Sequence, residues 1–339
     1  MSPRAFICGL SGPELTDEER RFVDDAEPWG IILFARNIRD AAQVRALVDE
    51  VRALLGRGDM PVLIDQEGGR VQRLRPPLAE RHPPAGAYAA RYAADPSGTT
   101  ERTRAGARLI AHELRDLHIN VDCLPVLDLE IPGAHAIVGD RAYGATPEQV
   151  SVLARAACEG LLAGGVLPVI KHVPGHGRAL ADSHEELPCV STPLPELQRL
   201  DFAPFRALND MPLGMTAHVL YTALDPERPA TLSRTVVQDV IRGFISFDGL
   251  LMTDDLSMKA LQGAMTARVE ESFAAGCDIA LHCNGDLAEM RAVAASSPRL
   301  SGDGARRAGA ALARLGAPKP FDIETARAQV RELLATAPA

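Results

Sequence analysis

Residues 166–188 read VLPVIKHVPGHGRALADSHEELP and carry the clearest signal in the sequence. The stretch begins as a buried strand, Val166 to Ile170, whose apolar character ends within one residue at Lys171 and His172. A proline and two glycines follow, so the backbone can take turns that are closed to other residues. A strand that ends in charged residues and opens into a glycine-rich loop with two further histidines is typical of a functional loop on a rigid scaffold. The alternative is a strand end with solvated histidines.

The rest of the chain alternates short apolar runs with segments of helical period. Eight runs, including the one above, have the length of a strand: residues 5–10, 30–34, 61–64, 119–129, 166–170, 213–219, 249–252 and 279–283. Helix signals lie between most of them. Examples are the capping box Thr16-Asp-Glu-Glu19 and the N-cap Asp40.

Repeated strand–helix units imply a parallel sheet with crossover helices. Eight such units over roughly 290 residues predict the α/β class and a single-domain (β/α)8 TIM-type barrel. The alanine- and arginine-rich tail is expected to form helices packed outside this barrel. An open doubly wound sheet is the alternative. No GxGxxG motif follows any predicted strand, which argues against a dinucleotide-binding version of that sheet.

The composition narrows the class of protein. The chain has 339 residues, of which 46% are hydrophobic, and its net charge of −9 with scattered lysine and arginine is unlike a nucleic-acid binder. No run reaches the length of a membrane span, and the N-terminus lacks the apolar segment of a signal peptide. The six cysteines are widely spaced without a CxxC pair, which suits free thiols in a reducing compartment. We therefore expect a cytoplasmic, monomeric protein with no nucleic-acid or membrane partner.

Polar side chains directly follow many of the predicted strands. In a (β/α)8 barrel the catalytic groups lie at the carboxyl ends of the strands, so these side chains are expected to meet at one mouth. They are Arg36, Asp65, Asp128, Lys171, His172, His218 and Asp254. One acidic residue after a strand is usually a helix cap, but seven polar strand ends favour a shared site. For the adjacent pair Asp254 and Asp255, the alternative is that they cap a helix beginning near Leu256.

These residues carry a resemblance to a known family. Lys171-His-Val-Pro-Gly-His-Gly177, followed by Asp182-Ser-His184, resembles the KHFPGHG…DSH signature of glycoside hydrolase family 3. More narrowly, it resembles the bacterial β-N-acetylhexosaminidases of the NagZ type, which act in peptidoglycan recycling. Val173 stands where phenylalanine is usual. Four further segments match in order and spacing: residues 30–37 (GIILFARN), 65–73 (DQEGGRVQR), 139–141 (GDR) and 253–258 (TDDLSM).

The resemblance covers almost the whole chain and implies its domain organisation. Many family members carry a second α/β domain, for which the remaining chain is too short. We expect one catalytic barrel over residues 1–339, with the barrel itself at about 4–300 and a helical tail at about 301–339.

The resemblance also implies a role for each matching residue. Asp254 is implied to attack the anomeric carbon and form a covalent glycosyl-enzyme, with His184 as general acid/base and Asp182 as its partner. The residues implied to bind the terminal N-acetylglucosamine are Asp65, Arg73, Arg141, Lys171 and His172. The implied activity is that of a retaining exo-β-N-acetylglucosaminidase acting on GlcNAc-β-1,4-anhydroMurNAc with or without peptide. No metal and no cofactor are implied.

General chemistry agrees with these roles. A retaining glycosidase needs a nucleophilic carboxylate on one face of the sugar and an acid on the other. The usual acid is a carboxyl group, but a histidine suits the task because it titrates near neutrality and a carboxylate stabilises its charged form. Charged groups such as Lys171, Arg141 and Asp65 form stronger hydrogen bonds with sugar hydroxyls than neutral groups do. The position of His184 on a glycine-rich loop predicts that the loop closes to complete the site.

Other classes of function are weighed against this one. A barrel metallohydrolase could use His172, His176, His184 and His218, but there is no HExxH motif and Lys171 would repel a cation. A non-catalytic sugar-binding barrel would be expected to lose the acid or the nucleophile, and both are present. Within the family, the alternatives are a glycosidase of broader sugar specificity and a glycosyl phosphorylase.

Overall fold

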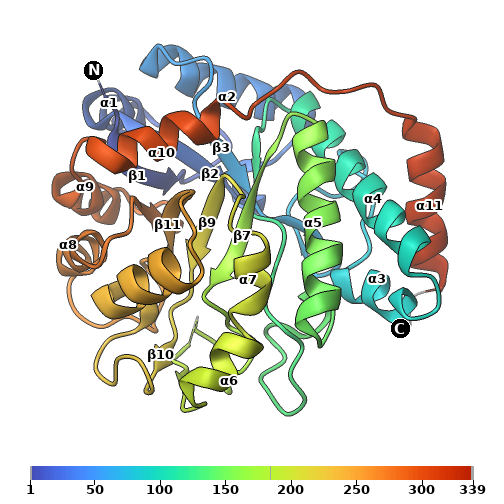
Figure 1. Cartoon of the computed structure of the whole chain (residues 1–339). Coiled ribbons are helices and arrows are strands. Elements are labelled where there is room, and N and C mark those ends of the chain that lie inside the picture. The colour runs from blue at the N-terminus through green and yellow to red at the C-terminus, as the bar shows by residue number, and fades with distance from the viewer. Residues whose placement is uncertain (1, 184, 337–339) are drawn as a thin grey trace.

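The computed structural model describes residues 2–183 and 185–336, in which eight strands form a closed parallel barrel (Figure 1). The strands follow one another around the barrel in chain order: β1 (Arg4–Gly9), β2 (Pro28–Leu33), β3 (Val62–Ile64), β6 (Val121–Asp122), β7 (Leu167–Val173), β9 (Leu213–Thr216), β11 (Leu250–Asp255) and β12 (Ile279–His282). Every neighbouring pair is parallel, and β12 pairs with β1 to close the sheet. The predicted barrel is confirmed. The open doubly wound sheet is excluded, because it would leave two edge strands unpaired.

Helices cover the outside of the barrel (Figure 1). They are α1 (Asp17–Ala26), α2 (Ala41–Leu55), α3 (Ala85–Tyr92), α4 (Pro96–Asp116), α5 (Pro147–Ala163), α6 (Leu194–Arg199), α7 (Ala203–Ala207), α8 (Met265–Ala275), α9 (Leu287–Ser296), α10 (Gly302–Leu312) and α11 (Ile323–Thr336). A π-helix (Val236–Phe244) lies between β9 and β11. The predicted caps are present: Thr16 and Glu19 form the capping box of α1, and Asp40 accepts from an amide of α2. In the described part of the chain, no helix has the length and apolar character needed to cross a bilayer.

The two helices of the tail occupy different places. Ala308 and Ala311 of α10 pack into the cluster of side chains that fills the barrel, so α10 covers one end of it. Helix α11 instead packs on the outer surface, where Val330 meets Leu109 of α4 (Figure 1). The prediction of C-terminal helices outside the barrel is confirmed.

The loops at the carboxyl ends of the strands contain the irregular parts of the fold. Strand β6 is shorter than the predicted run of residues 119–129, but the backbone beyond it still bonds to β7 through the Leu124 and Pro125 carbonyls and the Leu127 amide. Two small sheets are built from loops that follow β3, β7 and β9. They pair β4 (Gln66–Gly68) with β5 (Val71–Gln72), and β8 (Cys189–Val190) with β10 (Leu220–Tyr221). These sheets hold the loops that carry the site.

Candidate active site

The carboxyl ends of the barrel strands surround a pocket of about 140 Å³. Six residues that the sequence marks as site residues line it: Asp65, Arg73, Arg141, Lys171, His172 and Asp254. They are spread over 190 positions of the chain, from 65 to 254, and lie at the ends of β7 and β11 or in the loops that follow β3 and β6. Closure of the barrel is what brings them together.

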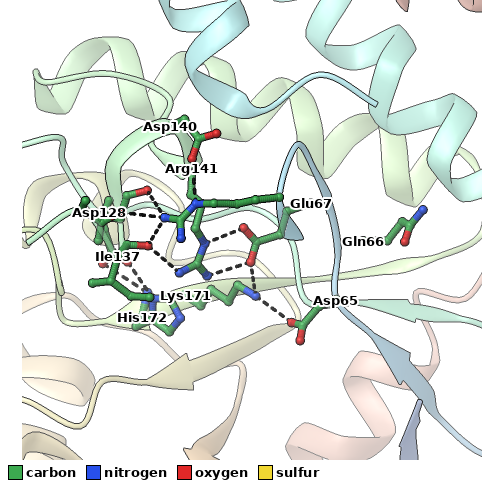
Figure 2. Close-up of polar contacts among 12 residues, drawn as sticks. Asp65, Gln66, Glu67, Asp128, Ile137, Asp140, Arg141, Lys171 and His172 are labelled. Atoms are coloured by element: carbon green, nitrogen blue, oxygen red, sulfur yellow. Dashed lines mark hydrogen bonds and ion pairs between the residues drawn. The ribbon is translucent and has the colours of Figure 1, made fainter. Parts of the chain in front are cut away.

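Lys171, near the end of β7, is the centre of a charged network on one wall of the pocket. Its ammonium group donates to Asp65 Oδ1 at 3.0 Å and lies 2.6 Å from Glu67 Oε1. Arg141 binds Glu67 through two parallel hydrogen bonds, both of 2.8 Å, and Arg73 donates to Asp65 Oδ2 at 2.9 Å. Figure 2 shows the Lys171 ammonium group between the two carboxylates. The network therefore fixes the positions of three cations and two anions.

These groups are held in their charged forms. Burial raises the pKa of the Asp65 and Glu67 carboxyls, but the neighbouring cations outweigh this effect. Lys171 and Arg73 hold the pKa of Asp65 well below its usual range, and Arg141 with Lys171 lowers the pKa of Glu67 to about 2. Burial opposes the charge of Lys171, yet the two carboxylates raise its pKa. At neutral pH the wall thus presents ionic donors and acceptors, which bind hydroxyl groups strongly.

The low pKa of Glu67 predicts a specific loss of stability in acid. Its usual value is near 4.5, and the folded value is about 2. A lowered pKa stabilises the fold above the unfolded value, and this contribution is lost as the pH falls from about 4.5 towards 2. The shift corresponds to on the order of 3 kcal/mol of unfolding free energy. We expect the unfolding free energy, measured with urea over this pH range, to depend less steeply on pH for Glu67→Gln than for the native chain.

The control for this prediction is Glu271→Gln, since Glu271 is an exposed carboxylate on α8. The unfolding free energy of Glu271→Gln should depend on pH as steeply as that of the native chain. If Glu67→Gln also matches the native chain, Glu67 does not gain its stabilisation from this network.

Asp128 anchors the start of the glycine-rich loop. It is fully buried and accepts hydrogen bonds from His172 Nδ1 at 2.7 Å, from the His172 amide at 3.3 Å and from the His176 amide at 2.6 Å. Burial raises the pKa of Asp128, but His172 and His176 bring it below its usual value. The carboxylate accepts the Nδ1 proton, so Nε2 is the nitrogen of His172 left for a ligand in the pocket.

Asp254 lies at the end of β11 and lines the same pocket. Burial raises the pKa of its carboxyl, but the nearby imidazole of His172 and a hydrogen bond from the Asp255 amide lower it overall. That amide donates to Asp254 Oδ1 at 2.8 Å. The side chain is therefore an oriented, ionised carboxylate, the state that a nucleophile requires.

The alternative role of Asp254 and Asp255 as helix caps is wrong. Strand β11 continues through Asp255, residues 256–264 form turns and bends, and α8 begins only at Met265. The Asp255 carboxylate accepts from the Ser257 amide at 3.0 Å, the Ser257 hydroxyl at 2.7 Å and the Cys283 amide at 3.1 Å. Asp255 holds the turn after the strand, while Asp254 faces the pocket.

The glycine-rich loop returns to the pocket at Ser183. This residue is buried and lines the pocket, its hydroxyl lies 3.3 Å from His176 Nε2, and its carbonyl accepts from the Ala260 amide at 3.2 Å. Asp182 is half-buried beside it. His184 lies outside the described residues. Its pairing with Asp182, its distance from Asp254 and the closure of the loop therefore stay predictions.

Besides Asp128, two further predicted strand-end residues do not line the pocket. Arg36 donates from Nε to the Leu10 carbonyl at 2.8 Å and also binds the Cys283 carbonyl, so it ties neighbouring loops together. His218 is fully buried behind Asp254 and Asp255. Neither side chain is in the set that surrounds the pocket.

Sequence reasoning placed Asp128 among the strand ends of the shared site without a specific role, and it gave Glu67 and His176 no role in sugar binding. A signal for Glu67 was available, because residues two apart on an extended chain share a face and Asp65 was already assigned. Asp128 was recognised as a strand end, but its bonds to two amides 44 and 48 residues away depend on the folded loop. His176 lines the pocket, and burial lowers its pKa to about 4.

Two of the acidic residues that line the pocket, Asp65 and Glu67, are paired with protein cations. Within residues 2–183 and 185–336, no cluster of three or more histidine, cysteine, aspartate or glutamate side chains has the arrangement of a metal site. Asp65 and Glu67 are bound by Lys171, Arg73 and Arg141. A divalent cation would have to displace these groups to reach the two carboxylates.

Comparison with known proteins identifies the class. The model of the family "Glycosyl hydrolase family 3 N terminal domain" matches residues 7–301. The chain therefore belongs to glycosyl hydrolase family 3 and is a glycoside hydrolase. A protein named Beta-hexosaminidase from Pseudomonas aeruginosa is 40% identical over 294 residues, covering 86% of each chain.

Solved structures give the same result. NagZ from Neisseria gonorrhoeae in complex with N-trifluoroacetyl-D-glucosamine superposes with a TM-score of 0.88 at 31% identity, over 98% of each chain. A second structure of the Neisseria protein, in complex with a zinc ion, superposes with a TM-score of 0.87 at 30% identity over 98% of each chain. The resemblance read from the motifs is thus confirmed at the level of the family.

Proposed function

We propose that this chain is a retaining exo-β-N-acetylglucosaminidase that releases terminal N-acetylglucosamine from peptidoglycan turnover fragments, namely GlcNAc-β-1,4-anhydroMurNAc with or without peptide. The observation that carries the proposal is the pocket itself. It joins an ionised carboxylate at the end of β11 to a wall of paired charges from β7 and the loop after β3. The first group suits attack on an anomeric carbon, and the second suits the binding of sugar hydroxyls.

In the proposed reaction, Asp254 attacks the anomeric carbon while His184 protonates the departing glycosidic oxygen. A covalent glycosyl-Asp254 forms, and the bond to the leaving sugar breaks. His184 then takes a proton from water, which attacks the same carbon and releases Asp254. His184 is neutral in the glycosyl-enzyme and charged before the first step and after the second. Asp182 would stabilise this charged form.

The remaining lining supports a preference for the N-acetylated sugar. Besides the charged wall, the pocket contains the apolar side chains of Ile32, Met215 and Leu281. Apolar lining with a few placed polar groups is typical of small-ligand sites. A methyl group of an acetamido substituent would find contacts there that a hydroxyl group would not use.

The proposal includes a cytoplasmic, monomeric enzyme without nucleic-acid or membrane partners. All six cysteines are free, and all except Cys189 are buried. Free thiols suit a reducing compartment.

The test is a panel of 4-nitrophenyl β-glycosides with the purified chain. We expect kcat/KM for the N-acetylglucosaminide to exceed that for the glucoside and the xyloside by at least about 10²-fold, because a site built to bind a substrate group discriminates against analogues that lack it. NMR of the first product should show the β-anomer, as retention requires. Chelation by EDTA should leave the rate unchanged.

Each alternative has its own result in the same panel. Equal rates on all three glycosides would indicate a glycosidase of broader specificity. Formation of a sugar 1-phosphate in phosphate buffer would indicate a phosphorylase. Loss of activity in EDTA that zinc restores would indicate a metallohydrolase, and binding without turnover would indicate a sugar-binding protein.

A further inference from the structure

His218 takes part in a continuous series of hydrogen bonds behind the pocket, the Thr216–Thr231–His218 network. The Asp254 amide donates to Thr216 Oγ1 at 3.3 Å, and Thr216 Oγ1 lies 2.7 Å from Thr231 Oγ1. Thr231 Oγ1 lies 2.7 Å from His218 Nδ1, and His218 Nε2 lies 3.0 Å from the Asp255 carbonyl oxygen. Thr216, Thr231 and His218 are all fully buried. The network starts at the Asp254 amide and ends at the Asp255 carbonyl.

The donor and the acceptor of each hydrogen bond in this network follow from the groups at its two ends. The Asp255 carbonyl can only accept, so Nε2 of His218 carries a proton. Burial lowers the pKa of His218 despite the Asp254 charge, so the ring is neutral and Nδ1 accepts from Thr231. Thr216 then donates to Thr231 and accepts from the Asp254 amide. The Ala217 carbonyl, 3.1 Å from Thr231 Oγ1, is the more distant choice for the one Thr231 proton.

The network holds the backbone of Asp254 and Asp255 at two points. Thr216 fixes the amide before the Asp254 side chain, and His218 fixes the carbonyl after Asp255. The Asp254 carboxylate is fixed in turn by the Asp255 amide, whose own orientation depends on the same backbone. Buried polar groups bonded in this complete way resist rotation, because any turn would leave a donor or acceptor without a partner.

We infer that His218 is a positioning residue that sets the angle and height of the Asp254 carboxylate through the Asp255 carbonyl, with Thr231 and Thr216 completing the linkage. This inference rests on the proposed role of Asp254 as nucleophile. His218 itself does not touch the sugar pocket. Its effect should fall on the rate of attack and not on binding, since the charged wall that binds the sugar lies on other strands.

The test compares two amide replacements of different length. In His218→Gln the amide nitrogen can occupy the place of Nε2 and donate to the Asp255 carbonyl; in His218→Asn the amide reaches only the place of Nδ1. A displacement of a reacting group by about 1 Å can cost about 10²-fold in rate. We expect His218→Asn to lower kcat on the 4-nitrophenyl N-acetylglucosaminide by roughly 10- to 100-fold with KM changed less than about threefold. His218→Gln should retain most of kcat.

A third variant separates positioning from general loss of packing. His282 is also a fully buried histidine, on the neighbouring strand β12, and its Nε2 binds Glu289 of α9 at 2.9 Å. His282→Asn should lower the melting temperature without a matching fall in kcat. Thr231→Val, which keeps the Nε2 contact but removes the Thr231 hydroxyl, should give a kcat between those of the native chain and His218→Asn.

Two results would overturn the inference. The first is equal kcat for His218→Gln and His218→Asn, whether high or low, at matched melting temperatures. The second is a loss that appears in KM with kcat unchanged. Absence of turnover by the native chain in the same assay would overturn the proposed function instead, so the two failures are distinguishable.

Discussion

Asp254→Asn is expected to abolish turnover while leaving the fold intact. Among the described residues, Asp254 is the only one that β11 contributes to the pocket wall. Its amide analogue has the same shape but no negative charge to form the glycosyl bond. The loss in kcat should exceed the roughly 10²–10⁴-fold that general acid/base assistance contributes, since every substrate needs the nucleophile. The melting temperature should change little.

A slow fluorinated glycosyl substrate provides the direct measurement. It should label the native chain once, and peptide mass spectrometry should place the sugar on Asp254. Asp255→Asn is the matched control, one residue away. Its carboxylate serves the turn at Ser257 and Cys283, so this variant should lose far less activity and should still be labelled. Label on Asp255, or no label at all, would refute the assignment of Asp254.

The loss of rate in variants of Asp182 and His184 should be the second large effect, and its size should depend on the leaving group. Departure of a sugar alcohol needs a proton from the acid, whereas departure of a nitrophenolate needs it much less. Asp182→Asn and His184→Ala should therefore slow turnover of the natural disaccharide severely, and the glycosylation step on the activated aryl glycoside more mildly. Because acid assistance is worth about 10²–10⁴-fold, pre-steady-state rates should resolve the gap between the substrates.

Two comparisons control this experiment. Asp254→Asn should show no gap, because both substrates require the nucleophile. Glu185→Gln changes an exposed carboxylate next to His184 and should leave both rates near those of the native chain. If the two loop variants slow both substrates equally, His184 is not the acid and another group at the mouth of the barrel must supply the proton.

Several features of this protein are determined by the sequence near each residue. An apolar run of strand length followed by a charged residue marks the end of a barrel strand, and this pattern located Asp65, Lys171 and Asp254 at the pocket. The capping residues Thr16 and Asp40 also act over one helical turn, so their roles were readable from spacing. The number and order of the strands followed from the same local signals, and they suffice to predict the barrel.

Other features were decided only by the tertiary structure. Glu67 meets Arg141, 74 residues further along the chain, and Asp128 receives the amide of His176, 48 residues further. His218 reaches the Asp255 carbonyl across 37 residues, although its position after a strand suggested a place in the pocket. No local pattern encodes these pairings, because closure of the barrel and the paths of its loops set the distances between strand ends. The side chain of a strand-end residue can face the pocket or the layer behind it, and only the packing of neighbouring loops selects one of the two.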